Sequence, residues 1–241
     1  EESMGKEYDF FKDKGLHNES IDLGFNHKSG LFVNGGYTRN NHGGWQGDLT
    51  GREKRWHPKD QALMNGMFGF QNRNMNVWYR LDFLDEKIFG PNNGSELQPE
   101  KVSDKDFLTK RYTHQLQSDW KLDNRLDVHA ALSYQDYKRR TRTTESDLST
   151  GEKWLSSAEA SQDITQYKAW IARATVAWNI APEFSVQPGV EYQWTQGEGG
   201  RIGGTPKVSD LAFFLSAEYK PWEWLSLRPG VRTFIVADYD A

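Results

Sequence analysis

An alternation of period two constrains this chain more than any other feature. In FSVQPGVEYQWTQ (184–196), every second residue from Phe184 to Trp194 is apolar or aromatic, and none of the residues between them is large and apolar. Successive side chains of a β-strand point to opposite faces, so this pattern predicts a strand with one apolar and one polar face. The same alternation recurs in LDVHAALSYQD (126–136), SDLAFFLSAEY (209–219) and LSLRPGVRT (225–233).

Segments of this kind fill most of the chain, and no helical pattern competes with them. By the period-two criterion there are about ten, starting near residues 19, 31, 62, 75, 107, 126, 167, 184, 209 and 225. The sequence therefore predicts an all-β chain built as a meander of antiparallel strands.

The composition agrees with strands that bury only one face. Hydrophobic residues make up 36% of the chain, and the mean hydropathy is −0.84. However, 14% of the residues are aromatic, and disordered chains are poor in aromatic residues. No apolar run is long enough for a transmembrane helix. The chain has no cysteine, which excludes disulfides and thiolate metal sites. Its net charge of −4 gives no indication of nucleic-acid binding.

Short and long connections alternate along the chain. Four hairpins share one spacing, in which five residues separate an aromatic residue from an apolar pair, at 25–33, 120–128, 178–186 and 219–227; a fifth short turn lies near 71–74. Long connections rich in Gly, Asn, Asp, Lys and Arg lie near 40–61, 88–106, 139–165 and 197–208. Short turns at one end and long loops at the other are typical of outer-membrane barrels. We therefore predict an antiparallel transmembrane β-barrel segment over 19–241, with 1–18 as an incoming loop.

Aromatic residues are spaced as the two girdles of such a barrel would be. Trp170 and Trp178 fall on one face eight residues apart, about 26 Å along a strand and about 19 Å across a bilayer at a 45° tilt. We predict a membrane-interface girdle made of Trp120, Trp170, Trp178, Trp194, Tyr219 and Trp222. A soluble β-sandwich whose aromatic residues form the core is the alternative.

Two prolines interrupt the strand pattern. Pro188 and Pro229 each precede a glycine four residues beyond a hairpin position. Because proline cannot donate to a β-ladder, we expect a bulge at each site.

Three segments resemble a known family. HKSGLFVNGGYTRNNHGGWQ (27–46), FGFQNRNMNVWYRLDF (68–83) and WLSLRPGVRTFIVADYDA (224–241) look like mid-barrel segments of TonB-dependent outer-membrane receptors, and YTRNNHGGW resembles those for iron complexes, haem and cobalamin. The resemblance implies the middle of a 22-stranded, plugged barrel in the bacterial outer membrane, importing a scarce metal complex such as a ferric siderophore or haem. A plug domain and a TonB-type energy transducer would be its partners, through contacts outside these residues, and no cofactor is implied.

Candidate ligand-binding residues share one long connection. His42, Trp45, Arg52, Arg55, Trp56 and His57 could catch an aromatic or anionic iron complex, with arginine for its charge, tryptophan for stacking and histidine for haem iron. A solvated loop is the alternative. Three arginines, at positions 173, 228 and 232, are predicted to face the lumen, where they would guide an anion, contact a plug or pair with acidic neighbours. The histidines show no metal-ligand spacing.

Membrane lipid and lipopolysaccharide are further expected partners, since the basic run KRRTRTTESD (138–147) would meet lipopolysaccharide phosphates if it faces outward. A complete small outer-membrane barrel acting as a protease, adhesin or pore is the alternative to a receptor. Its catalytic candidates would be Asp136, Glu145 and Asp147. Because they show no paired acid and base at a convincing spacing, we predict no enzymatic activity.

Overall fold

The described part of the chain forms a single antiparallel sheet. The computed structural model describes residues 16–200, 202 and 204–240, so most of the predicted incoming loop lies outside the described residues. Its strands are β1 (Leu16–Asn26), β2 (Leu31–His42), β3 (Lys59–Gln71), β4 (Met75–Gly90), β5 (Lys101–Lys121), β6 (Leu126–Asp147), β7 (Lys153–Leu155), β8 (Ile164–Ala181), β9 (Phe184–Glu198), β10 (Lys207–Trp222), β11 (Leu225–Leu227) and β12 (Gly230–Asp240). The described residues include no helix that could cross a membrane.

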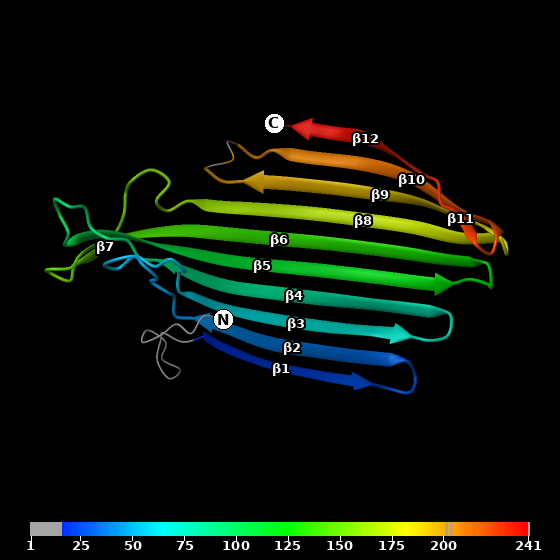
Figure 1. Ribbon diagram of the computed structural model, residues 1–241, viewed down its shortest axis with the longest axis horizontal. Coiled ribbons are helices and arrows are strands. Elements are labelled where there is room, and N and C mark those ends of the chain that lie inside the picture. Colours follow the sequence, from blue (N-terminus) through cyan, green and yellow to red (C-terminus); the bar gives the residue numbers. More distant parts are fainter. Residues whose placement is uncertain (1–15, 201, 203, 241) are drawn as a thin grey trace.

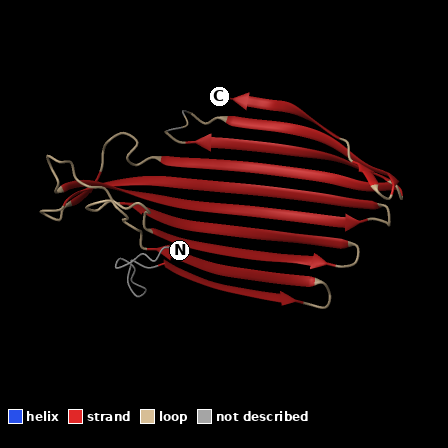
Figure 2. Cartoon of the chain, viewed as in Figure 1, coloured by secondary structure: helices blue, strands red, loops and turns tan. Residues whose placement is uncertain are grey.

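Each long strand pairs with the next along the chain, from β1 to β12 (Figure 1). The three-residue strands β7 and β11 only extend the pairing of β6 and β10. The predicted all-β antiparallel meander is therefore confirmed, and the strands form one layer without helices (Figure 2). Within the described part of the chain β1 and β12 are not paired with each other, so closure with further strands stays a prediction.

The two ends of the sheet differ, as Figure 1 shows. Turns of two to four residues follow β1, β3, β5, β8 and β10 at one end. The longer connections at the opposite end cover 43–58, 91–100, 148–163 and 199–206. They are shorter than the ranges expected from sequence because the strands run further, with 101–106 in β5 and 139–147 in β6.

The strand register sorts side chains onto two faces. One row of directly paired residues crosses ten strands and is apolar or aromatic throughout: Phe25, Val33, Phe68, Tyr79, Leu116, Leu132, Ala172, Tyr192, Leu211 and Ile235. Because side chains alternate, the next row toward the short turns lies on the other face, and its members include Gln117, Arg173 and Glu191. We call the two sides the apolar face and the polar face.

Nothing in the described chain covers the apolar face. Side chains that a soluble protein would bury are largely exposed, including Leu23 (71%), Phe68 (60%) and Val231 (65%). Only three hydrophobic residues of the described chain are buried: Leu84, Val102 and Ala212. The aromatic residues therefore do not form the core of a two-layer sandwich.

The expected proline bulges are absent from the described strands. Around Pro188 the pairing of β8 with β9 lapses after Thr175↔Gly189 and resumes in the same register at Trp178↔Val186. Pro229 lies between β11 and β12, where the strand is interrupted. The prediction of a bulge was wrong at both sites, because the missing N–H can also be accommodated by a gap in pairing.

Candidate functional site

The apolar face is a band of limited height. It extends along β5 from Tyr112 to Trp120 and along β8 from Trp170 to Trp178, so that its ends are eight residues apart on each strand. That length corresponds to about 26 Å along the strand, or about 19 Å across a bilayer at a 45° tilt, compared with an apolar band about 25 Å tall in outer-membrane barrels. On the loop side the next residues on this face are charged, and they include Arg39, Asp85, Lys110, Asp136 and Lys168.

The predicted girdle residues lie at the two edges of this band. Trp120, Trp178, Tyr219 and Trp222 end their strands at the short-turn side and are between 44% and 58% exposed. Trp222 shares this face because the register of β10 with β11 shifts between Tyr219 and Trp222. At the loop-side edge, Trp170 pairs directly with Trp194.

A ladder of rings crosses the band from β3 to β8. Phe68, Tyr79, His114, Tyr134 and Trp170 follow one another with ring centroids 4.4–6.1 Å apart. His114 is the one polar member, and its Nδ1 lies 2.6 Å from the Tyr79 hydroxyl. That hydrogen bond explains how an imidazole is tolerated on an apolar face, since a polar group without a partner is costly to remove from water. The sequence pattern showed where His114 lies but not its partner.

Two of the three predicted lumen arginines lie together on the polar face. The side chain of Glu191 of β9 is 14% exposed; it forms an ion pair with Arg173 of β8 at 2.7 Å and accepts a hydrogen bond from Arg232 of β12. The guanidinium of Arg232 spans β10, where Ala212, paired with Glu191, presents only a methyl group. The Phe214 ring lies 5.4 Å from Arg173 and 5.7 Å from Arg232. We call Arg173, Glu191, Arg232 and Phe214 the arginine cluster.

Arg228 lies apart from this cluster, near the short turns, where it donates to Glu218 at 2.8 Å. A further polar-face network centres on Asp119, whose carboxylate lies 2.8 Å from His129 Nδ1 and 3.1 Å from Gln117 Nε2. This network was not predicted from the sequence. Its only signal was the placing of Asp119 and His129 at polar positions of consecutive strands.

The end of β2 and the 43–58 connection bring together three of the six predicted ligand residues. Trp45 and Trp56 form an isolated β-bridge with N–O distances of 2.9 and 3.0 Å, and their ring centroids are 5.4 Å apart. The His42 ring lies 6.0 Å from that of Trp56. Trp56 is 58% exposed, so this trio offers an accessible aromatic surface.

The other three residues point elsewhere. Arg52 donates to both carboxylate oxygens of Asp104 at 2.6 and 3.0 Å, which ties the 43–58 connection to β5. Arg55 donates to Asp48 at 2.7 Å. His57 lies beside the backbone of Gly90 at the end of β4. Both arginines thus already have a carboxylate partner, which weakens their case as anion receptors.

No group of three or more His, Asp or Glu suited to a metal ion occurs in the described part of the chain. The acidic residues considered for the enzyme alternative do not converge either. Asp136 lies on the apolar face and accepts a hydrogen bond from Gln166, whereas Glu145 lies on the polar face and is bonded by Ser156 and Trp154. Asp147 accepts hydrogen bonds from the turn that follows it.

No protein-family model matches this sequence, and no curated protein sequence matches it. Solved structures do resemble it. The outer membrane transporter YddB from Escherichia coli shares 12% identity at a TM-score of 0.63, over 92% of this chain and 34% of that chain.

Two other structures have lower TM-scores. The copper transporter OprC shares 10% identity at a TM-score of 0.47, over 90% of this chain and 44% of that chain. The ferric citrate transporter FecA in its unliganded form shares 11% identity at a TM-score of 0.46, over 91% of this chain and 42% of that chain. The chain thus spans 34% of the length of the first structure. The expected resemblance is confirmed at the level of the fold.

Proposed function

We propose that this chain forms part of the barrel wall of an active-transport receptor in the bacterial outer membrane. The receptor would bind a scarce metal complex, such as a ferric siderophore or haem, and import it. A plug domain and a TonB-type energy transducer would act through residues outside this segment.

The apolar band is the observation that carries this proposal. One face of a single-layer sheet is largely apolar between positions eight residues apart on β5 and on β8, edged by tryptophans and then by charges, while the other face is largely polar. Such a face is unfavourable in water, whereas acyl chains cover it without cost to the backbone, whose polar groups are satisfied between strands. Similarity in fold to an outer-membrane transporter supports the same assignment.

The proposed roles of the two remaining surfaces follow from their chemistry. The His42–Trp45–Trp56 trio offers ring faces for an aromatic or conjugated ligand at the mouth. On the polar face, the arginine cluster has two cations for one carboxylate, so it carries a net positive charge toward the lumen. Such a surface could pair with a plug carboxylate or guide an anionic complex.

Two measurements test this proposal. Antibodies against the 148–163 connection would be used to blot fractionated source cells; we expect a band two to three times larger than 27.8 kDa in the outer-membrane fraction. Uptake of a radiolabelled ferric complex would then be compared between intact cells, cells lacking the protein and complemented cells, with and without an uncoupler. Energy-dependent uptake that needs the protein supports the proposal. A band near 27.8 kDa, or uptake indifferent to the protein across a panel of iron complexes, argues against it.

A further inference from the structure

Cations gather on the apolar face just beyond the loop-side edge of the band. Lys110 of β5 lies directly opposite Lys138 of β6, and Arg140 and Lys168 occupy neighbouring positions on the same face. Like charges in directly opposed positions destabilise a strand pair. Lys110, Lys138 and Arg140 are exposed. We call these four residues the basic row.

The basic row has too few carboxylates to balance it. Asp85 lies 3.6 Å from Lys110, and Asp136, opposite Lys168, accepts a hydrogen bond from Gln166. Glu198 of β9, opposite Gln166, is a third carboxylate on this face, so four cations share three carboxylates, and no ion pair involves Lys138, Arg140 or Lys168 within the described chain. An external anion on this outward surface would relieve the repulsion.

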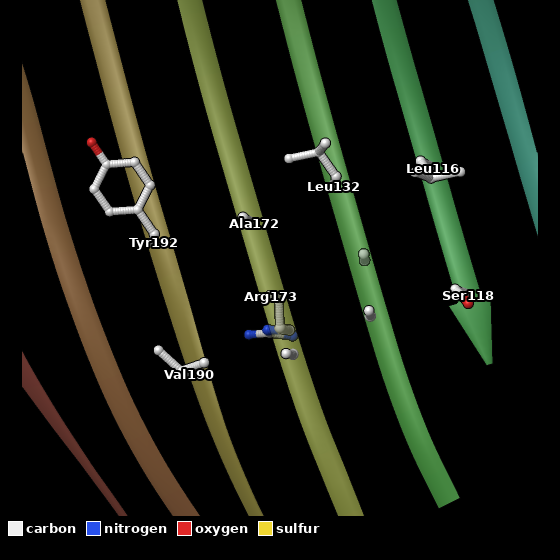
Figure 3. A pocket seen from close by; sticks show the side chains of 10 residues that line it. Leu116, Ser118, Leu132, Ala172, Arg173, Val190 and Tyr192 are labelled. Carbon is white, nitrogen blue, oxygen red and sulfur yellow. The ribbon is translucent and has the colours of Figure 1, made fainter. Parts of the chain in front are cut away.

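An apolar groove of about 390 Å³ lies below the basic row on the same strands (Figure 3). Its floor is Ala172 and Ala174 of β8 with Ala130 and Ser118; Leu116 and Leu132 form one wall, and Val190 and Tyr192 form the other. The groove follows β8, because the small residues repeat along that strand. Figure 3 shows Leu132 and Tyr192 on either side of Ala172.

The depth of the groove suits an acyl chain. The groove is lined by two rows of paired residues, one containing Leu132 and Ala172 and the other Ala130 and Ala174. These rows lie two and four residues from the Tyr134–Trp170 edge of the band, which is about 7 and 13 Å along the strand. One leaflet contributes about 15 Å of hydrocarbon. The groove therefore lies within the leaflet on the loop side, beneath the basic row.

The width of the groove decides between occupants. Neighbouring strands lie about 4.8 Å apart, so in the row of Leu132 and Tyr192 the backbones of the walls on β6 and β9 are about 10 Å apart before their side chains fill part of that space. In the next row Ala130 and Ser118 leave the groove open toward β5. A helix with its side chains is about 10–12 Å across and does not fit between them. A single hydrocarbon chain does.

We propose that the basic row and the groove together bind one phosphorylated lipid of the loop-side leaflet, with its phosphate on Lys110 and Lys138 and an acyl chain along β8. This site rests on the proposed placement of the apolar face in the outer membrane. A phosphate supplies the missing negative charge, and Lys138 and Arg140 belong to the basic run that the transport role leaves unexplained.

The test uses the intact purified protein in detergent and native mass spectrometry with two probes that differ only in the phosphate, dioleoylphosphatidic acid and dioleoylglycerol. We expect the wild type to retain phosphatidic acid in clear preference. Replacing both lysines, in Lys110→Gln/Lys138→Gln, should weaken that binding on the order of twentyfold, because each basic residue at a membrane surface contributes about fivefold. Ala172→Leu/Ala174→Leu fills the groove while keeping the face apolar, and it should weaken binding of the phosphatidic acid as well.

The matched control is Arg73→Gln/Lys121→Gln, which removes two exposed cations at the short-turn end and should leave binding unchanged. Equal retention of both probes, or equal binding by wild type and both variants, would overturn the lipid site. Fractionation is scored first: a wild-type protein found outside the outer membrane refutes the proposed function, whereas an outer-membrane protein without lipid preference refutes only this site. If the lysine variant does not assemble, the salt dependence of phosphatidic acid binding to the wild type is measured instead. Binding that does not weaken with added salt would overturn the proposal.

Discussion

Arg232 of β12 reaches across β10 to the carboxylate of Glu191 on β9. This contact ties together strands that are not neighbours, and it depends on the small Ala212 between them, which is 1% exposed. Arg173 binds the same carboxylate from the other side, so one glutamate on β9 is paired with both β8 and β12. The pairing lies on the polar face, where the sequence pattern placed both arginines.

Replacing this glutamate should loosen the C-terminal half of the sheet. Glu191→Gln leaves two guanidinium groups without their counter-charge, and hydrogen bonds to charged groups contribute about 1.5–3 kcal/mol each before solvent screening. Since both arginines are partly exposed, we expect a loss of about 1–2 kcal/mol. Denaturant unfolding in micelles measures it. Glu198→Gln, at the exposed end of β9, is the control, and an equal effect of the two changes would show that the cluster contributes nothing.

Gly189 should resist substitution because Phe214 covers it. A Cβ at Gly189 would lie 2.2 Å from the Phe214 ring, so Gly189→Ala forces that ring away and should cost about 1–3 kcal/mol. Combining it with Phe214→Ala should cost less than the sum of the two changes. Gly66→Ala is the control, because a Cβ there meets nothing within 4 Å. Strict additivity in an unfolding cycle would mean that ring and glycine do not interact.

Arg52 should anchor the 43–58 connection, and Arg55 should not. The bidentate ion pair of Arg52 with Asp104, whose side chain is 13% exposed, joins that connection to β5. In the Arg55–Asp48 pair both side chains are exposed. Exposed pairs contribute about 0–1 kcal/mol. Arg52→Ala should therefore make the connection several times more sensitive to limited proteolysis, and Arg55→Ala should change little. Equal cleavage rates for these two variants would contradict the anchoring role.

The turn after β6 should depend on pH. The hydroxyl of Ser149 and the backbone N–H groups of Thr150 and Ser149 donate to the Asp147 carboxylate and hold its pKa below the usual range. A depressed pKa means that the stabilisation is present above the ordinary carboxyl pKa and is lost as pH falls through the lowered value. Amide exchange over 148–152 should speed up at acidic pH in the wild type, beyond the intrinsic pH effect seen in Asp147→Asn. Parallel profiles for both proteins would rule this out.

The local sequence pattern predicted the fold, but it did not predict where the strands end or which side chains interact between distant parts of the sequence. The period of two in 184–196 was enough to assign both faces, because an antiparallel strand with one covered face reads directly as alternation. The strand ends were underestimated, since Lys101–Asp106 (apart from Val102) and Arg139–Asp147 are polar and resemble loop sequence while still pairing.

The candidate site was predicted only in part, for a related reason. Trp45 and Trp56 share one connection and were both candidates from the sequence, but the contact between their rings was not predicted. The partner of Arg52 is Asp104, 52 residues away, and no local pattern shows which carboxylate a long loop will meet. His114 on the apolar face was a visible irregularity whose explanation, the Tyr79 hydroxyl, lies on another strand.

The most direct test of the central claim is which face of the sheet touches lipid. The chain has no cysteine, so single cysteines at Val190 and Gln187 can be labelled with a fluorophore in the assembled protein. Quenching by a nitroxide carried in the middle of the lipid acyl chain should be strong at position 190 and weak at position 187. Equal quenching at both positions, or stronger quenching at 187, would contradict the assignment of the apolar face to the membrane.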